Sequence, residues 1–271
     1  MKKRTNKTED SQGIFIDAHS EIGILLLHGF TSSPSQFAES AGFLADRGFT
    51  VYAPTIAGHG ATPQDLYRTS IKDWKESVSR ALDRLRKKVK RVYLAGTSFG
   101  GNLAFYLVAN TDGNTNIKGV ISLATPIWTH QQRLVKLRLY TYGYLKRYHP
   151  KPTPKYPTGE LVDCQDVMEE KSYSLIPLPS LRRFYKFIKQ ETIPNLSRIK
   201  IPVLVVQSKS DPVVDCRSAQ YIYDHIFSGQ KEILWLDSCQ HSITRDANRL
   251  EVFQHVCDFI EGIESKKKKS A

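Results

Sequence analysis

Long hydrophobic runs are absent from this sequence of 271 residues. The longest aliphatic stretch, residues 22–27, has the length of a strand, whereas a membrane-spanning helix needs roughly 18 or more apolar residues. The basic N-terminal segment MKKRTNKTED is not followed by an apolar stretch, so we expect no secretory signal. With 40% hydrophobic and 24% charged residues, the composition predicts an ordinary globular protein without a transmembrane segment.

Cysteine is scarce, and its four positions (164, 216, 239 and 257) show no C-x-x-C spacing. This pattern argues against a zinc ribbon and against a disulfide framework, and it favours a reducing compartment. The eight histidines include no H-E-x-x-H or other metal-binding spacing. We therefore expect a cytoplasmic protein that has no metal site and needs no cofactor.

Acidic residues are outnumbered, with 27 Asp and Glu against 39 Lys and Arg, which gives a formal net charge of +12. The excess is local: residues 1–10 carry a net +2, residues 266–269 carry +4, and residues 127–190 carry +7. The rest of the chain is close to neutral. Because no nucleic-acid-binding motif accompanies the charge, we expect no nucleic-acid partner.

Apolar strand-sized segments alternate with amphipathic or apolar helix-sized segments along the chain. In the helix expected at 70–88, apolar residues such as Ile71, Trp74 and Val78 recur at three- and four-residue spacing. This alternation predicts an α/β fold with a mostly parallel sheet and helices on both faces. The expected strands are 22–27, 49–53, 92–95, 119–124, 201–207 and 232–236, and the other expected helices begin near 33 and at 102 and 245.

One segment, residues 127–195, interrupts the alternation. It is rich in tyrosine and basic residues, and prolines 150, 152, 154 and 157 divide it. Connections of that length are usually inserted functional elements such as lids. We therefore divide the chain into a core (12–126 and 196–264), an inserted cap (127–195) and basic flexible tails (1–11 and 265–271).

The pentapeptide Gly96-Thr97-Ser98-Phe99-Gly100 fits the G-x-S-x-G pattern of a nucleophile elbow. It lies directly after an expected strand and directly before an expected helix, which is the context that the chemistry needs. Side chains at Gly96 and Gly100 would crowd such a turn. Ser98 is therefore the predicted nucleophile.

A serine nucleophile needs a base, and the base needs an acid that orients it. Asp211 follows the fifth strand and His241 follows the sixth, so both are expected at the same sheet edge as Ser98. Asp215, a rival acid, is expected at the start of the next helix, and Asp237 is expected in a loop or cap. The remaining histidines are assigned surface or packing roles, except two that lie near the pocket.

The tetrahedral oxyanion needs preorganised N–H donors. The backbone N–H of Phe99, next to the nucleophile, is one predicted donor, and that of Phe30 is the other. Gly29 allows the turn that carries Phe30, and the two pocket histidines, His28 and His59, are expected to shape the surrounding pocket.

Taken together, LLLHGF (25–30), GHG (58–60), AGTSFGG (95–101), SDPVV (210–214) and the His241 loop resemble the α/β-hydrolase superfamily. They are most similar to bacterial carboxylesterases and monoacylglycerol-lipase-like serine hydrolases. The resemblance runs from about residue 22 to 263, and the cap matches only in position and length. It implies Ser98, Asp211 and His241 as a catalytic triad.

We therefore expect a serine esterase that acts on a small-molecule ester, with short- to medium-chain acyl esters or monoacylglycerols as candidates. A thioesterase or acyltransferase would use the same triad, and a non-catalytic receptor of the same fold stays open. The sequence leaves the physiological acyl group and the oligomeric state undetermined. The basic cap is expected to contact anionic lipid surfaces weakly, or its charges only keep an apolar lid soluble.

Overall fold

The computed structural model describes residues 7–10, 13–111, 116–151 and 173–269. Its centre is an eight-stranded sheet in the order β1-β2-β4-β3-β5-β6-β9-β10. From β4 to β10 every neighbouring pair in this order is parallel, whereas β1 pairs with β2, and β2 with β4, in antiparallel fashion. These strands are β1 (Lys7–Asp10), β2 (Gly13–Ile16), β3 (Ile22–Leu27), β4 (Thr50–Pro54), β5 (Arg91–Thr97), β6 (Ile117–Leu123), β9 (Val203–Ser208) and β10 (Lys231–Leu236).

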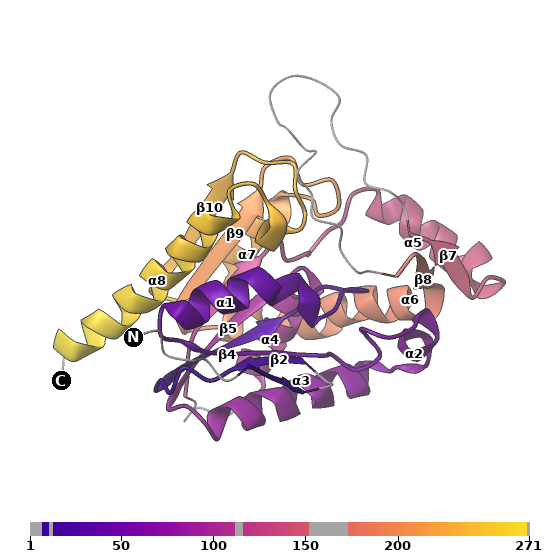
Figure 1. The fold of residues 1–271 in the computed structure, drawn as a ribbon. Helices are drawn as coiled ribbons and strands as arrows, with labels where there is room; N and C mark the ends of the chain where they lie inside the picture. Colours follow the sequence, from indigo (N-terminus) through magenta and orange to yellow (C-terminus); the bar gives the residue numbers. More distant parts are fainter. Residues whose placement is uncertain (1–6, 11–12, 112–115, 152–172, 270–271) are drawn as a thin grey trace.

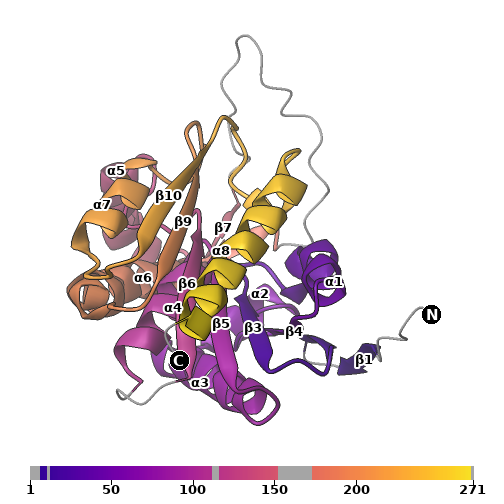
Figure 2. The same cartoon turned by 90° about the vertical axis from the view of Figure 1, so that its left-hand side faces the viewer.

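Helices cover both faces of this sheet (Figures 1 and 2), as the alternation predicts. Along β3, Ile24 and Leu26 pack toward α1 and α8, whereas Leu25 and Leu27 pack toward α3 and α4. A strand that is buried on both faces reads as a continuous aliphatic run for this reason. The helices are α1 (Ala38–Asp46), α2 (Pro63–Arg68), α3 (Ile71–Arg86), α4 (Phe99–Ala109), α5 (Gln132–Tyr140), α6 (Leu178–Phe187), α7 (Arg217–His225) and α8 (Arg249–Lys269).

Local sequence explains where α3 begins. The Ser70 side chain accepts a hydrogen bond from the Asp73 backbone N–H at 3.2 Å, and the Asp73 carboxylate accepts one from the Ser70 N–H at 2.7 Å. Such a capping box satisfies two N–H groups that the first turn would otherwise leave unpaired. Thr62 and Asp65 form the same motif at the start of α2, a helix too short to show an apolar period in the sequence.

The helix expected from Ser33 begins differently. Residues Pro34–Phe37 form a 3-10 turn, η1, before α1, and the Ser33 hydroxyl contacts the Ser35 hydroxyl at 2.7 Å instead of capping the helix. The other single turns are η2 (Tyr142–Tyr144), η3 (Ile188–Thr192, a π turn), η4 (Ile193–Arg198) and η5 (Ile243–Arg245).

Secondary structure also extends into both segments that were expected to be flexible tails. Residues 7–10 pair with β2 as strand β1, and α8 continues to Lys269. Lysine is a good helix former, and positive charge at a helix C-terminus complements the helix dipole, so the lysine run prolongs α8. In the described part of the chain, no helix combines the length and apolar character that crossing a bilayer requires.

The connection from β6 to β9 holds α5, α6, η2 to η4 and a two-stranded antiparallel ribbon, β7 (Tyr148–Pro150) with β8 (Leu175–Pro177). Figure 1 shows α5, α6 and β7 together at one side of the sheet. Leu139, Phe184 and Phe187 of this connection belong to the same buried cluster as Trp74 and Phe99. The connection is therefore packed onto the main core.

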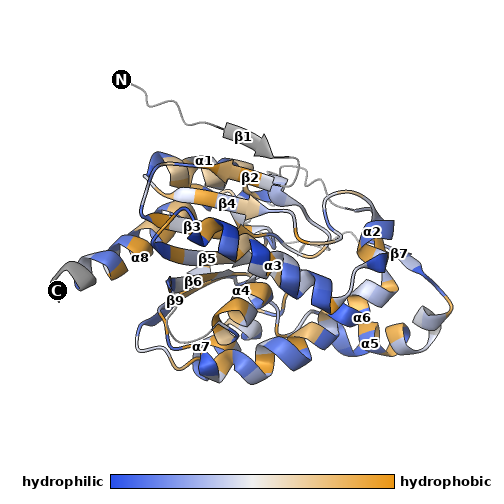
Figure 3. Cartoon of the chain, turned by 90° about the horizontal axis from the view of Figure 1, so that it is seen from below, coloured by the Kyte–Doolittle hydropathy of each residue, from blue (hydrophilic) through white to orange (hydrophobic). Residues whose placement is uncertain are grey.

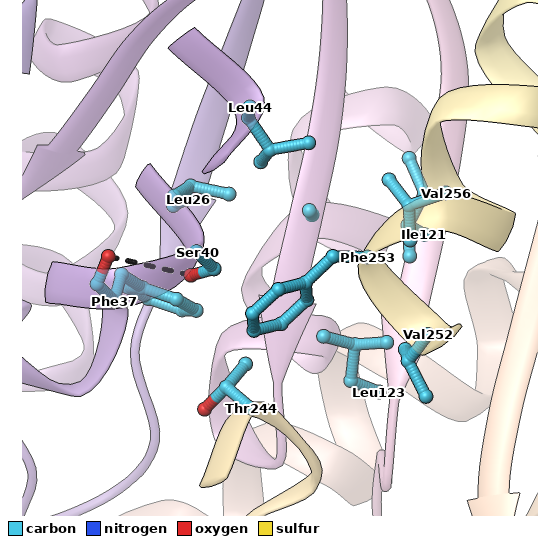
Figure 4. Close-up of a pocket in the computed structure, with 11 residues that line it drawn as sticks. Leu26, Phe37, Ser40, Leu44, Ile121, Leu123, Thr244, Val252, Phe253 and Val256 are labelled. Carbon is cyan, nitrogen blue, oxygen red and sulfur yellow. Dashed lines mark hydrogen bonds between the residues drawn. The ribbon is translucent and has the colours of Figure 1, made fainter. Parts of the chain in front are cut away.

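A small cavity of about 20 Å³ lies between the sheet, α1 and α8 (Figure 4). Its walls are mostly aliphatic and aromatic, including Leu44 and Phe253. Its two hydroxyls are already engaged: Ser40 donates to the Phe37 carbonyl and Thr244 to the Gln36 carbonyl. This cavity is therefore a packing void in the core, with no group free to bind a ligand among those that line it.

Truncating a side chain that walls this void tests the packing of α8. We expect Phe253→Ala to lower the free energy of unfolding by about 3–5 kcal/mol, because it removes a buried ring and enlarges an existing cavity. Leu250→Ala is the matched control on the same helix, since Leu250 is 50% exposed, and it should change stability by less than about 0.5 kcal/mol. Urea unfolding measures both, and equal losses would contradict the packing described here.

Candidate active site

Ser98 lies at the turn between β5 and α4 with φ 53° and ψ −119°. Its backbone N–H donates to the Leu123 carbonyl of β6 at 2.7 Å, and its own carbonyl accepts from the Gly101 N–H at 3.0 Å. A non-glycine residue in this conformation costs about 1–3 kcal/mol and persists only where its surroundings hold it. The strain is located at the predicted nucleophile, as expected for a nucleophile elbow.

The two glycines that flank Ser98 allow the close crossing of β5, α4 and β3. A Cβ atom on Gly100 would lie 1.8 Å from the Leu27 carbonyl oxygen. A Cβ atom on Gly96 would lie 2.3 Å from backbone atoms of Gly100. Both contacts involve backbone, which cannot move away as a flexible side chain can. The steric reason given from the sequence is therefore confirmed.

Asp211 follows β9, and four donors surround its buried carboxylate. Oδ1 accepts from the backbone N–H groups of Val213 and Val214 at 2.8 and 2.9 Å. Oδ2 accepts from His241 Nδ1 at 2.9 Å and from Gln207 Nε2 at 3.2 Å. These hydrogen bonds to a charged group fix the orientation of the carboxylate.

The two other acids that the sequence offered near this edge have different partners. Asp215 binds Arg217 through three hydrogen bonds, and this guanidinium holds the pKa of the Asp215 carboxyl below its usual range. Asp237 is exposed and pairs with Lys209 at 2.7 Å. Of the three candidates, Asp211 is the one bonded to His241.

The tautomer of His241 follows from its partner. Because the Asp211 carboxylate only accepts, Nδ1 of His241 carries the proton in this contact and Nε2 is left as the basic nitrogen. The loop that carries His241 is held on both sides of Gln240. Ser208 donates to the Gln240 carbonyl at 2.7 Å, and Ser238 accepts from the Gln240 N–H at 3.0 Å.

The two peptide groups on either side of Gly29 are both held by side chains. The Ile56 N–H donates to His28 Nε2 at 3.1 Å, so the His28 proton lies on Nδ1, which donates to the Gly29 carbonyl at 3.0 Å. The Gly29 N–H in turn donates to the buried Gln36 Oε1 at 3.2 Å. Because C=O and N–H point in opposite directions across a trans peptide, fixing the Gly29 carbonyl also fixes the Phe30 N–H.

The rings of the two residues chosen as oxyanion donors are in contact. The Phe30 and Phe99 ring centroids are 6.0 Å apart, and both rings also contact Trp74 of α3 and Phe184 of α6. Such edge-to-face contacts stabilise a fixed arrangement of the two loops. The structure thus brings the turn after β3 next to the elbow after β5.

His28 and His59 are buried side by side, with ring centroids 5.2 Å apart. Burial lowers the pKa of His28 to about 3 and that of His59 to about 4, because an imidazolium loses its hydration there. Both rings are therefore neutral near pH 7.

Three residues around the site escaped the sequence analysis. Gln36 and Gln207 hold the oxyanion turn and Asp211, and His130 Nε2 contacts the Asp211 carbonyl at 2.8 Å. None of them lies in a motif, so spacing alone carries no signal for them. In the described part of the chain, no three His, Cys, Asp or Glu side chains are grouped to hold a metal ion.

Cys239, two residues before His241, is disulfide-bonded, which the spacing of the cysteines did not predict. Cys216 and Cys257 are free thiols, and Cys164 lies outside the described residues. Sequence spacing missed this because a disulfide depends on proximity in the fold and not on separation along the chain. The argument from cysteine spacing to a reducing compartment therefore no longer holds.

A serine on a strained strand-to-helix turn, with an Asp–His pair after later strands of the same parallel sheet, defines the α/β-hydrolase class. Within it, the chain belongs to the family described as serine aminopeptidase, S33, whose model matches residues 18–248. The resemblance noted from the sequence motifs is thereby confirmed at the level of the superfamily.

Two curated relatives align over most of the chain. A carboxylesterase of Bacillus subtilis (strain 168) is 27% identical over 243 residues, which are 89% of this chain and 93% of the relative. A thermostable monoacylglycerol lipase of Bacillus sp. (strain H-257) is 29% identical over 245 residues, 90% and 92% of the two chains.

Solved structures show the same fold. The chain matches a structure reported among metagenome-derived lipolytic enzymes with a TM-score of 0.79 and 26% identity, covering 90% of this chain and 94% of that one. It matches the monoacylglycerol lipase of Paleococcus ferrophilus with a TM-score of 0.73 and 18% identity, covering 89% and 94%.

Adding a methyl group at the elbow tests the close crossing there. We expect Gly100→Ala to destabilise the protein by about 3 kcal/mol or more, because the new Cβ meets the Leu27 carbonyl. Gly42→Ala is the control: in α1 no atom lies within 4 Å of the added Cβ, and the change should stabilise by about 0.5–1 kcal/mol. Thermal unfolding measures both, and equal tolerance of the two changes would refute the steric argument.

The buried histidines predict how stability depends on pH. An unfolded histidine binds a proton below about pH 6.5, whereas His59 and His28 in the folded state resist it down to about pH 4 and about pH 3. The unfolded state therefore binds more protons in this window, and stability falls as the pH drops. Each histidine contributes up to about 1.4 kcal/mol per pH unit.

We expect His59→Asn to reduce that slope by about one proton in urea unfolding between pH 6.5 and pH 4.5. Phe253→Ala, which weakens the fold without removing a histidine, should keep the original slope. If His59→Asn also keeps it, the neutral buried state of His59 is not the cause.

Proposed function

We propose that the chain is a serine hydrolase that cleaves carboxylic esters through an acyl-enzyme. The observation that carries the proposal is the 2.9 Å contact between Asp211 and His241 at the sheet edge where the strained Ser98 turn also lies. The relatives named carboxylesterase and monoacylglycerol lipase support esters as the substrate class.

In this mechanism the Ser98 hydroxyl attacks the ester carbonyl, and His241 Nε2 accepts its proton. Asp211 keeps the His241 proton on Nδ1 and stabilises the imidazolium that forms. His241 then returns the proton to the leaving alcohol. A water molecule, deprotonated by His241, hydrolyses the acyl-enzyme and regenerates Ser98.

The Phe30 and Phe99 backbone N–H groups would stabilise the tetrahedral oxyanion. Their placement is supported by contacts outside the reacting centre. His28 and Gln36 bind the peptide groups on either side of Gly29 and so orient the Phe30 N–H. We infer that these two side chains are positioning residues that preorganise the oxyanion hole before substrate arrives.

We also propose that the cap expected at residues 127–195, of which residues 152–172 lie outside the described residues, contributes to an acyl pocket through Tyr173 and α6. Phe184 of α6 lies 5.2 Å from Phe30, and the Tyr173 hydroxyl donates to the Gly58 carbonyl, so the cap reaches both turns that flank the site. An apolar aromatic wall suits a short- to medium-chain acyl group or a monoacylglycerol.

Removing each triad residue tests the assignment. Ser98→Ala should abolish ester turnover and labelling by a fluorophosphonate, and Asp211→Asn should lower kcat on the order of 10⁴-fold because His241 loses its orienting partner. Asp215→Asn is the control and should stay within a few-fold of the parent. Full activity in Asp211→Asn with loss in Asp215→Asn would contradict the assignment of the acid.

The substrate class is tested by comparing kcat/KM across p-nitrophenyl esters of rising chain length, monoacylglycerols, an acyl-CoA and an aminoacyl p-nitroanilide. The proposal expects Ser98-dependent hydrolysis of the oxyesters to exceed that of the thioester and the amide. A preference for the thioester or the amide would overturn the ester assignment, and no turnover despite fluorophosphonate labelling would indicate a non-catalytic role.

A further inference from the structure

An apolar surface stripe runs along α5 and the turn that follows it. Leu137 is 62% exposed and Leu145 is 87% exposed. Isolated exposed apolar residues are ordinary, but a contiguous group of them marks an interaction surface. We call this group the α5 stripe; it consists of Leu134, Leu137, Tyr140, Tyr144 and Leu145.

The α5 stripe is separate from the apolar residues that hold α5 in place. Leu139 is buried, and the partly buried Val135 packs against the main core. Arg182 of α6 donates to the carbonyls of Leu139 and Gly143 at 3.2 and 3.1 Å, which anchors the C-terminal end of α5. Packing and anchoring therefore use the inner side of α5, and folding does not account for the outer leucines.

The segment that carries the α5 stripe holds charge of one sign. Residues 127–151 contain no Asp or Glu. They contain six basic residues: Arg133, Lys136, Arg138, Lys146, Arg147 and Lys151. Figure 3 shows α5 and β7 at one end of the molecule, where hydrophobic and hydrophilic segments alternate. Exposed leucines and tyrosines among lysines and arginines are typical of protein surfaces that lie in the interface of a bilayer.

We propose that this face, the α5 stripe with its basic surround, docks onto an anionic lipid bilayer. The leucine side chains enter the boundary between headgroups and acyl chains, and the lysines and arginines remain beside the lipid phosphates. The negative surface potential of an anionic leaflet adds an attraction that salt weakens.

Charge favours a lipid surface over a second copy of the chain as the occupant. In a two-fold dimer the same patch meets itself, so the exposed basic residues of one copy would face those of the other. Like charges at short range repel, and no acidic residue between 127 and 151 offsets them. An anionic bilayer offers phosphates to the basic side chains and an apolar interior to the exposed leucines.

Docking at α5 also places the candidate site near the lipid. Just before α5, Thr129 pairs with Val214, and the His130 N–H donates to the Val213 carbonyl at 3.0 Å, in the loop that begins with Asp211. Ester substrates with apolar chains partition into bilayers, so this arrangement extends the proposed function to substrates held at a lipid surface. Vesicle binding is nevertheless measured without turnover, so docking and ester hydrolysis can fail separately.

The leucine arm of the test is co-sedimentation of the full chain with phosphatidylcholine vesicles that contain or lack phosphatidylglycerol. We expect binding to the anionic vesicles to fall about tenfold or more in Leu137→Ser with Leu145→Ser. Phe227→Ser, which removes a 69% exposed ring outside the stripe, is the matched control and should bind as the parent does. Hydrolysis of a soluble short-chain ester should be unchanged in all of them.

The charge arm of the test uses two double variants. The first combines Arg133→Gln and Arg138→Gln, and the control combines Lys87→Gln and Lys88→Gln, which replace two exposed lysines at the end of α3. The first pair should lower binding to anionic vesicles about tenfold and weaken its dependence on salt, and the control pair should not.

Three results would overturn the proposal. Equal binding to neutral and anionic vesicles would remove the role of the basic surround. Equal losses in the stripe variants and in their controls would remove the role of this face. Absence of vesicle binding, together with concentration-dependent self-association that Leu137→Ser with Leu145→Ser abolishes, would assign the stripe to a second copy. Unchanged hydrolysis of the soluble ester in any of these cases would leave the proposed function standing.

Discussion

The strained backbone of Ser98, at φ 53° and ψ −119°, is the constraint on which the candidate site depends. A turn this sharp forces α4 to leave the sheet directly over β3, and only glycine at Gly100 allows it to pass the Leu27 carbonyl. That close crossing brings the turn after β3, with Phe30, beside the turn after β5. The energetic cost of the Ser98 backbone conformation is offset by the packing of the buried helix and the two buried strands around it.

Hydrogen bonds between buried polar groups then complete the site. The Gly29–Phe30 peptide is held by His28, and the Asp211 carboxylate accepts four hydrogen bonds. An unpaired polar group in such a setting is costly, so these networks specify one geometry where apolar packing would tolerate several. His28 takes part in this network as a neutral ring, because burial lowers its pKa to about 3.

The connection between β6 and β9 joins the site in two ways. Inward, Phe184 packs against the rings of Phe30 and Phe99, so the connection belongs to the main core. Outward, α5 leaves leucines exposed among basic residues, which a helix that only packs on a core has no reason to do. The same connection therefore contributes residues to the core beside the site and to the exposed surface of the molecule.

The sequence by itself determined the parallel strands from β4 to β10, the helices α1, α3, α4 and α8, and the residues at the ends of β5, β9 and β10, because period, chain order and turn chemistry are local properties. The tertiary structure decided what depends on proximity. It placed Asp211, the acid already preferred from the sequence, in contact with His241, brought Gln36 and Gln207 to the site, and paired Cys239. It also separated the leucines of α5 that face the core from those that face solvent, since apolar residues on both sides of a helix look alike until one side is packed.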